Sequence, residues 1–310
     1  MPSWVIAGAS RGIGLEFVNQ LSANSANEVF GIIRSAPNPE LSELASSRNN
    51  LHIIQADVSD ASSLSRAAQE VAARTGNKLD VLIHNACSTG LEFRFYPATA
   101  FTDKPDELKK ELDACVCFRP LNFCASSAVK LTLSQVHVNL LGAIYTINSF
   151  LPLIRNGQEK KIVYITSPSG DAKFTRACSV TVTLGYSISK AGMNLMIAKY
   201  AAELAGEGIK TLALSPGWVD TDGSKSPSLA VQSNDLVRWA DFYPVTSARD
   251  MAPTEEYLQL ALQAFQKLNP NITRLLTTEE SVQQQLEVIN KLTAEQSGLA
   301  LSHHGDENWL

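Results

Sequence analysis

The apolar positions of this chain follow two alternating patterns. Short runs, with little polar alternation, are typical of strands buried on both faces of a parallel sheet. Longer segments between them carry apolar residues three and four positions apart, as amphipathic helices do. The predicted strands cover Trp4–Ala7, Val29–Ile33, His52–Gln55, Val81–His84, Ile162–Ile165 and Thr211–Leu214. The predicted helices between them cover Gly12–Leu21, Ala61–Arg74, Val136–Leu151 and Ser187–Ala205.

Strands that alternate with helices predict an α/β fold with a doubly wound parallel sheet. We expect a single domain over residues 1–310, interrupted by two insertions at about residues 91–133 and 222–273. Further helices are predicted at Lys104–Leu112, Glu255–Lys267 and Glu280–Leu292. The irregular segment Cys115–Val129 carries a single charge, Arg119, which suits either a genuine loop or an unspliced gene segment. Both alternatives stay open at this point.

Composition narrows the class of protein. The formal net charge of −5 arises from 26 basic and 31 acidic residues scattered along the chain, so no long field of one sign is available for nucleic acid or anionic lipid. No apolar run approaches the roughly 18 residues that span a bilayer, and no signal-like region precedes the first glycines. The five cysteines lack paired spacing. We therefore expect a soluble cytoplasmic protein with reduced thiols, no metal site, and neither nucleic acid nor membrane as a partner.

A glycine-rich turn, Ala7-Gly8-Ala9-Ser10-Arg11-Gly12-Ile13-Gly14, joins the first predicted strand to the first helix. Glycines permit a tight turn and close approach of backbone amides to a pyrophosphate, and the positive end of the helix dipole favours that anion. The motif predicts a dinucleotide site. The alternative is a glycine-rich turn that binds nothing.

The end of the second strand indicates which dinucleotide is bound. An acidic residue about 20 positions after the glycines would accept hydrogen bonds from the ribose diol of NAD. This chain instead has Arg34, with no carboxylate before Glu40. Arg34 and Arg11 offer guanidinium groups suited to a 2′-phosphate, which favours NADP(H). Alternatively, both arginines are solvated surface residues.

Tyr186 and Lys190 lie four positions apart and therefore on one face of a predicted helix. A phenol of reference pKa about 10 is a poor catalyst near neutrality, but a nearby ammonium favours the phenolate and lowers the pKa. We expect Lys190 to do this for Tyr186 while also holding the ribose hydroxyls. An ordinary exposed pair on a helix is the alternative interpretation.

The order of these motifs resembles the short-chain dehydrogenase/reductase family, most closely its sniffer and C-factor carbonyl reductases. The resemblance covers residues 2–221 and about 276–305, and it rests on the glycine turn, the Tyr186–Lys190 pair, and three motifs after later strands: Asn85-Ala86-Cys87, Ser167 and Pro216-Gly217. It implies a Rossmann-type sheet, NADP(H) as cofactor, a small-molecule carbonyl or alcohol as substrate, and a homodimer or homotetramer.

The resemblance also implies individual roles. Ser167 would hydrogen-bond the substrate carbonyl oxygen, Tyr186 would donate the proton, Lys190 would tune Tyr186, and Asn139 would anchor a water that links Lys190 to solvent. Ser169 is a rival for Ser167. The implied cofactor-binding residues are Gly8, Ser10, Arg11, Gly12, Ile13, Gly14, Arg34, Asp57, Val58, Asn85, Ala86, Tyr186, Lys190, Pro216, Gly217, Val219 and Thr221.

Some of these residues have structural alternatives. Asp57 could instead cap the helix after Ser59, and Asn139 could be a satisfied buried amide within its own helix. We expect three histidines to be packed or solvated rather than catalytic: His137, His303 and His304.

The chain departs from the family pattern at several points. Ala7 replaces a threonine and Cys87 replaces a glycine, and we expect neither to touch a reacting group. Ser167 and Tyr186 lie 19 positions apart, which predicts an extended loop over the site at residues 170–185. The insertion at 222–273 falls where the family keeps its mobile substrate lid.

Three functions remain open. The first is NADPH-dependent reduction of a ketone or aldehyde to an alcohol, or the reverse oxidation. The second is a non-redox reaction on the same fold, such as dehydration, epimerisation or cyclisation. The third is a nucleotide-sensing module without turnover, against which the intact set of catalytic residues argues.

Overall fold

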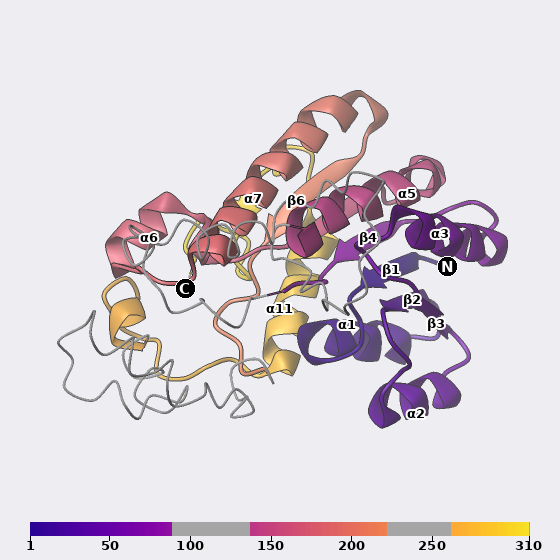
Figure 1. Ribbon diagram of the computed structural model, residues 1–310, viewed down its shortest axis with the longest axis horizontal. Helices are drawn as coiled ribbons and strands as arrows, with labels where there is room; N and C mark the ends of the chain where they lie inside the picture. The colour runs from indigo at the N-terminus through magenta and orange to yellow at the C-terminus, as the bar shows by residue number, and fades with distance from the viewer. Residues whose placement is uncertain (89–136, 222–261, 310) are drawn as a thin grey trace, which may run out of the picture.

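The computed structural model describes residues 1–88, 137–221 and 262–309. Its seven strands form one parallel sheet in the order β3-β2-β1-β4-β5-β6-β7 (Figure 1). This order reverses direction at β1, as in a doubly wound sheet, and confirms the predicted fold class. The strands are β1 (Ser3–Ala7), β2 (Glu28–Ile33), β3 (Leu51–Gln55), β4 (Val81–His84), β5 (Lys161–Ile165), β6 (Lys210–Leu214) and β7 (Ala300–Leu301).

The helices predicted at Gly12–Leu21, Ala61–Arg74, Val136–Leu151, Ser187–Ala205 and Glu280–Leu292 are present, the third of them ending five residues later than predicted. The helices that connect the strands are α1 (Gly12–Ala23), α2 (Pro39–Ser47), α3 (Ala61–Thr75), the π-helical turn η2 (His137–Leu141), α5 (Gly142–Asn156), the 3₁₀ turn η3 (Pro168–Gly170), α6 (Ala172–Cys178), α7 (Leu184–Leu204), the 3₁₀ turn η4 (Ala205–Glu207) and α11 (Thr278–Lys291). The helix predicted at Lys104–Leu112 lies outside the described residues. The helix predicted at Glu255–Lys267 lies partly within the described residues, where residues 262–266 are helical.

Besides the two short 3₁₀ turns, three described elements escaped the sequence analysis: α2, α6 and β7. Helix α2 carries the usual start signals, since Asn38 accepts a hydrogen bond from the Leu41 amide at 2.8 Å and Pro39 occupies the first turn. The apolar pattern of α2 is too weak to predict a helix, because Leu41 is the one buried residue in it. Helix α6 and strand β7 are too short, at seven and two residues, to show a period.

The sheet buries a separate apolar layer on each face. Alternate residues of β1 divide between the layers, with Val5 on one face and Ile6 on the other. Helices α3, α5 and α7 cover the first face, whereas α1, α2 and α11 cover the second (Figure 1). Because the helices cover the two faces of the sheet, the loops that carry the predicted site lie at the C-terminal ends of the strands.

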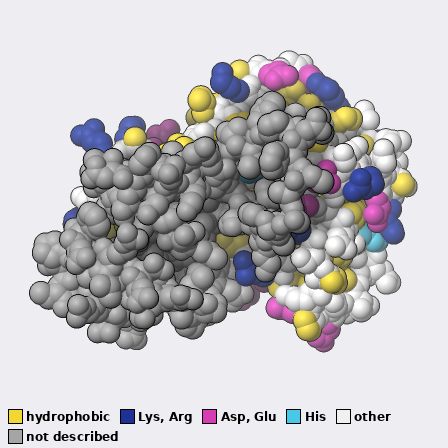
Figure 2. Space-filling model, in the orientation of Figure 1, with side chains coloured by type: hydrophobic (Ala, Val, Ile, Leu, Met, Phe, Trp, Pro, Cys, Tyr) yellow, Lys and Arg dark blue, Asp and Glu magenta, His cyan; other side chains and the backbone are white. Residues whose placement is uncertain are grey.

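The stretch His137–Asn156 is long and apolar enough to cross a membrane by length and composition. More than half of its most apolar window is buried inside the protein, where α5 packs against α3 and β4. It is the core helix of the first layer. Figure 2 shows acidic and basic side chains interspersed over the described part of one face, without a broad area of one sign.

Candidate active site

The glycine turn has the backbone geometry that only glycine adopts easily. Gly8 and Gly12 have φ angles of +90° and +54°. A Cβ on Gly8 would lie 2.6 Å from the Cα of Ala86, so β1 and the end of β4 meet here without room for a side chain. At Gly14, a Cβ would lie 2.0 Å from the carbonyl oxygen of Gly8 and 2.5 Å from Asn85 Nδ2. Gly14 therefore lets α1 begin directly against the turn.

The N-terminus of α1 is suited to an anion. Arg11, the residue before the helix, has an extended backbone and makes no side-chain cap, so it leaves the first-turn amides to other acceptors. Asn85 Nδ2 donates to the carbonyl oxygen of Gly8 at 2.9 Å and fixes the turn from β4. Thr221, which follows β6, lies in ordinary contact distance of a Cβ at Gly12, 3.8 Å away. These residues fit the pyrophosphate of a dinucleotide.

The second strand ends in a polar surface. Arg11 and Arg34 are both exposed, as is Ser10. Asn38 Nδ2 donates to the carbonyl oxygen of Ser10 at 3.1 Å, so the residue that caps α2 also ties α2 to the glycine turn. Sequence reasoning missed Asn38, although the Asn-Pro pair was visible. The exposed guanidiniums are free to meet a phosphate, and the solvated alternative stays open.

Asp57 does not cap the following helix, so that alternative was wrong. Its Oδ1 accepts from the amide of Ser59 at 2.9 Å and from the Ser59 hydroxyl at 2.7 Å, closing a turn after β3. The cap of α3 is Asp60, whose carboxylate accepts from the Ser62 amide. The side chain of Val58 is buried in the first core layer. Any contact from Val58 to a cofactor would therefore use its backbone.

Ser167, Tyr186 and Lys190 come together as the sequence predicted. Ser167 follows β5, and its hydroxyl lies near enough to Tyr186, in the first turn of α7, to affect the pKa of the phenol. The Ser167 hydroxyl also accepts from the amide of Ser169 at 3.2 Å. Ser167 thus lies near the phenol and fits the substrate-binding role better than its rival Ser169.

The pKa of Tyr186 moves against the expectation. Burial raises the pKa of this phenol well above its usual range, the neighbouring Cys87 raises it further, and the Ser167 hydroxyl opposes both. The Lys190 ammonium lies 5.4 Å from the Tyr186 ring centre and donates to Tyr164 and Ile165, and it does not offset the effect of burial on the pKa of the phenol. In this structure Tyr186 is a protonated phenol at neutral pH, which is the form that can donate a proton.

Lys190 points into the protein and is only 2% exposed. Its Nζ donates to the hydroxyl of Tyr164 at 2.8 Å and to the carbonyl oxygen of Ile165 at 2.7 Å, both on β5. Burial lowers the pKa of Lys190, and contact with Cys87 raises it in part. Sequence reasoning missed Tyr164, whose only signal was a phenol within an otherwise apolar strand.

Asn139 is fully buried in the π-helical turn. Its side chain bonds to Ser88, after β4, and to the hydroxyl of Ser189 on α7, at 2.7–3.0 Å. Asn139 is therefore a satisfied buried amide, as the structural alternative expected, and its partners lie on two other segments. Asn139 thereby joins η2 to both sides of the site.

Cys87, which we expected to touch no reacting group, lies near Lys190 and Tyr186. Cys87 is exposed, and its thiol donates to the carbonyl oxygen of Ser88 at 3.7 Å. The sulfur lies near enough to Lys190 and to Tyr186 to raise the pKa of both groups. The side chain that replaces the family's glycine thus lies among the catalytic candidates.

Residues 170–185 do not form the extended loop that we predicted. Asp171 caps α6 by accepting from the Phe174 amide at 2.6 Å, so a short helix shortens the connection. Gly170 packs on the backbone of Lys190, where a Cβ would lie 2.7 Å from the Lys190 carbonyl carbon. The Phe265 ring lies 5.6 Å from that of Phe174 and 5.1 Å from that of Trp218. These rings link α6 with the residues after Gly217.

The segment after β6 is held by the C-terminal part of the chain. The hydroxyl of Ser281 donates to the carbonyl oxygen of Pro216 at 2.6 Å, and Val219 pairs with Leu276. Gly217, with φ of +81°, has no room for a Cβ, which would lie 2.8 Å from the imidazole of His303. His303 is buried, as predicted for a packed histidine.

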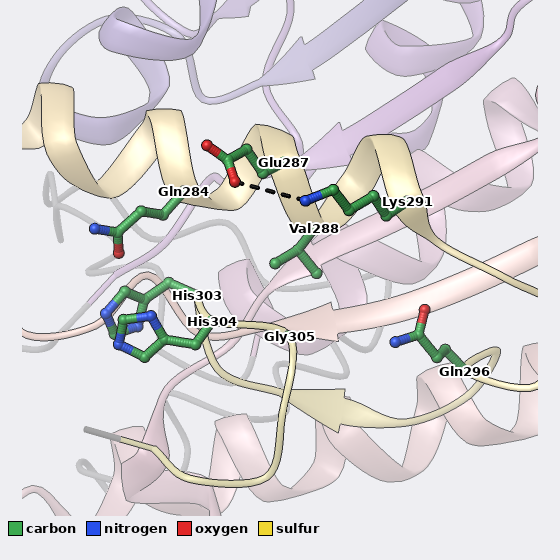
Figure 3. A pocket seen from close by; sticks show the side chains of 8 residues that line it. All are labelled: Gln284, Glu287, Val288, Lys291, Gln296, His303, His304 and Gly305. Carbon is green, nitrogen blue, oxygen red and sulfur yellow. Dashed lines mark ion pairs between the residues drawn. The ribbon is translucent and has the colours of Figure 1, made fainter.

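Two cavities lie away from the catalytic candidates. The first, of about 250 Å³, separates α11 from the C-terminal segment, where His303 and His304 stack beneath Gln284 and the Glu287–Lys291 ion pair (Figure 3). The second, of about 480 Å³, lies beside α6 and is lined in part by Phe174 and Trp309. Neither is lined by Ser167, Tyr186 or Lys190. In the described ranges, no group of three or more His, Cys, Asp or Glu side chains could hold a metal ion.

Comparisons with known proteins agree with this arrangement. The model of the family described as short chain dehydrogenase matches residues 3–110 and 114–230. A short-chain dehydrogenase/reductase of an Arthrinium species, atnB, is 59% identical over 310 residues, covering all of both chains. A second, AacuF of Aspergillus aculeatus, is 35% identical over 315 residues with the same coverage.

Solved structures share the fold. The NADPH-bound carbonyl reductase from chicken fatty liver has a TM-score of 0.68 at 23% identity and covers 99% of this chain and 93% of its own. The carbonyl reductase Sniffer of D. melanogaster has a TM-score of 0.67 at 19% identity and covers 99% of this chain and 98% of its own. At these identities the likeness establishes the architecture.

Proposed function

Because this chain belongs to the short-chain dehydrogenase family of oxidoreductases, we propose that it reduces a ketone or aldehyde to an alcohol with NADPH. One observation carries the proposal: Ser167 and Tyr186 lie close enough for the serine hydroxyl to oppose the rise in the pKa of the phenol, at the sheet edge that also bears the glycine turn. Two hydroxyl groups so arranged can both donate to one carbonyl oxygen.

Each residue then has a defined task. Ser167 and Tyr186 hold the carbonyl oxygen, and Tyr186 gives it a proton as the alkoxide develops. The raised pKa of Tyr186 keeps the phenol protonated beforehand. The Lys190 charge favours the phenolate that remains once the proton has left. Bound NADPH supplies the hydride to the carbonyl carbon, so the product gains two hydrogens in total.

The proposed NADPH site runs along the same edge. The first-turn amides of α1 would hold the pyrophosphate, Asp57 would face the adenine, and Pro216 and Gly217 would meet the nicotinamide. Arg34 and Arg11 would take the 2′-phosphate, for which their exposure at the end of β2 and in the glycine turn leaves room. NADPH in the chicken carbonyl reductase is consistent with this choice.

Asn139 is proposed to complete the set by fixing the segment between β4 and α7. Its hydrogen bonds to Ser88 and Ser189 hold its side chain in place, so we propose no role in which that side chain moves. A water held by the surrounding π-helical backbone would link Lys190 to solvent, because a π turn displaces carbonyl groups from the α-helical ladder. We further propose a cytoplasmic homodimer or homotetramer.

The test is direct. The protein is incubated with a panel of ketones, aldehydes and quinones, and both NADPH absorbance and product mass are followed. We expect NADPH consumption matched by a product two mass units heavier, with a deuterium transferred from 4-deuterated NADPH. A product formed without NADPH consumption would instead establish a non-redox enzyme.

A further inference from the structure

Tyr164 lies directly beneath the proposed site. It is 1% exposed and stands on β5, three residues before Ser167, facing the layer of α3, α5 and α7. Its hydroxyl is 2.8 Å from Lys190 Nζ. This phenol therefore makes a direct bond to the lysine, whereas the Tyr186 ring centre lies 5.4 Å from the same nitrogen.

A buried ammonium needs acceptors, because burial without them is costly. Lys190 finds two on one strand, the Tyr164 hydroxyl and the Ile165 carbonyl. An ammonium has three N–H donors. Strand β5 thus fixes the direction of the side chain and leaves one donor for the cofactor ribose or Tyr186.

The Tyr164 ring is itself fixed from β4. His84 stacks on it with ring centres 5.6 Å apart and an interplanar angle of 18°. The imidazole is fully buried and is hydrogen-bonded through Nδ1 to Thr146 Oγ1 at 3.1 Å. Because the Thr146 hydroxyl donates to the carbonyl of Gly142 at 2.7 Å, it accepts the Nδ1 proton of a neutral His84.

We propose that Tyr164 is a positioning residue for the reductase, whose hydroxyl holds the Lys190 ammonium against β5 so that the lysine enters the reaction charged and correctly aimed. The role in turnover rests on the proposed function, whereas the bond to Lys190 does not. His84 packs against the Tyr164 ring, and the Lys190 charge in turn lowers the pKa of its imidazole.

Among the described residues, four titratable groups face Lys190: Tyr164 from β5, Tyr186 on its own helix, Cys87 after β4, and His84 behind Tyr164. Of these four, it is Tyr164 that accepts a hydrogen bond from the ammonium, at 2.8 Å. Removing the Tyr164 hydroxyl withdraws an acceptor from the charged form, so the pKa of Lys190 should fall. Turnover that needs the charged lysine should then decline at a lower pH.

The decisive variant is Tyr164→Phe, which keeps the ring against His84 and deletes one oxygen. We expect NMR of isotope-labelled lysine, assigned with Lys190→Met, to show a Lys190 pKa about one unit lower than in the unaltered protein. The alkaline limb of the kcat profile should shift down by a similar amount, so kcat at pH values above that limb should fall by up to about tenfold. The KM for NADPH should change much less.

Tyr200→Phe is the matched control, because Tyr200 lies on the same helix and its hydroxyl bonds to the exposed Asn148 at 2.7 Å. It should leave both the Lys190 pKa and the kcat profile unchanged. A Tyr164→Phe protein with an unshifted Lys190 pKa would overturn the inference. If the unaltered protein reduces no carbonyl compound, the proposed function fails, yet the NMR titration still decides whether Tyr164 holds Lys190.

Discussion

Asn139 pairs with the backbone of Ser88 through both ends of its side-chain amide. Oδ1 accepts from the Ser88 amide at 2.7 Å, and Nδ2 donates to the Ser88 carbonyl at 2.9 Å. Nδ2 also donates to the Ser189 hydroxyl at 3.0 Å. One buried side chain thus connects the end of β4 and helix α7, the two segments that flank the proposed reaction.

We predict that Asn139→Ala lowers the free energy of unfolding by about 2–4 kcal/mol, because it leaves buried partners without hydrogen bonds. Urea denaturation measures this change. Asn148→Ala, on the exposed side of the adjoining helix, should cost less than about 1 kcal/mol. Equal losses in the two variants would show that the Ser88 pairing contributes little.

Replacing Tyr186 with phenylalanine removes the proposed proton donor and keeps the ring. We expect kcat to fall by at least about 100-fold while the Kd for NADPH, measured by fluorescence titration, changes less than about threefold. An undiminished kcat would show that another group supplies the proton.

The glycine turn provides a steric test. Gly14→Ala places a methyl group 2.0 Å from the Gly8 carbonyl oxygen, so we expect loss of NADPH binding and a lower melting temperature. Gly206→Ala is the control, since nothing lies within 4 Å of a Cβ there. It should be neutral or slightly stabilising. Normal NADPH affinity in Gly14→Ala would contradict the proposed pyrophosphate site.

In our proposal, Arg34 determines the preference for NADPH over NADH. Arg34→Ala should weaken NADPH binding about tenfold or more, the effect of losing a charge-assisted hydrogen bond. NADH affinity should hardly change, because NADH lacks the 2′-phosphate. Titration of both coenzymes measures the ratio, and an equal loss for both would contradict the assignment.

The two buried histidines predict that the free energy of unfolding decreases as the pH falls. Burial and the Lys190 charge lower the pKa of His84 to about 3, and burial with the neighbouring His304 lowers the pKa of His303 to about 4. Both folded values lie below the unfolded value of about 6.5. Each histidine therefore contributes stability that is complete above pH 6.5 and is lost as the pH falls toward its folded value.

The expected slope in that window is up to about 1.4 kcal/mol per pH unit for each histidine. Urea denaturation between pH 7 and pH 5 measures it, and His84→Leu should reduce it by about half. A stability that does not change across this range would mean that the imidazoles are accessible to protons in the folded state.

The sequence by itself determined the order of the elements and the place of the motifs. Six strands were predicted to within one residue at each end, because buried parallel strands show as short apolar runs. The glycine turn and the pair Tyr186 and Lys190 depend on local spacing along one strand, turn or helix. The sequence also placed Ser167 after its strand, where it lies near Tyr186.

Only the tertiary structure decided what those side chains touch. Spacing puts Lys190 on the same helix face as Tyr186, but its ammonium turns to Tyr164 and Ile165 on a strand more than 20 residues earlier. The partners of Asn139 and the position of Cys87 depend likewise on which strands lie next to each other. A buried polar group takes the acceptor that packing brings within reach, and neither periodicity nor motif spacing contains that information.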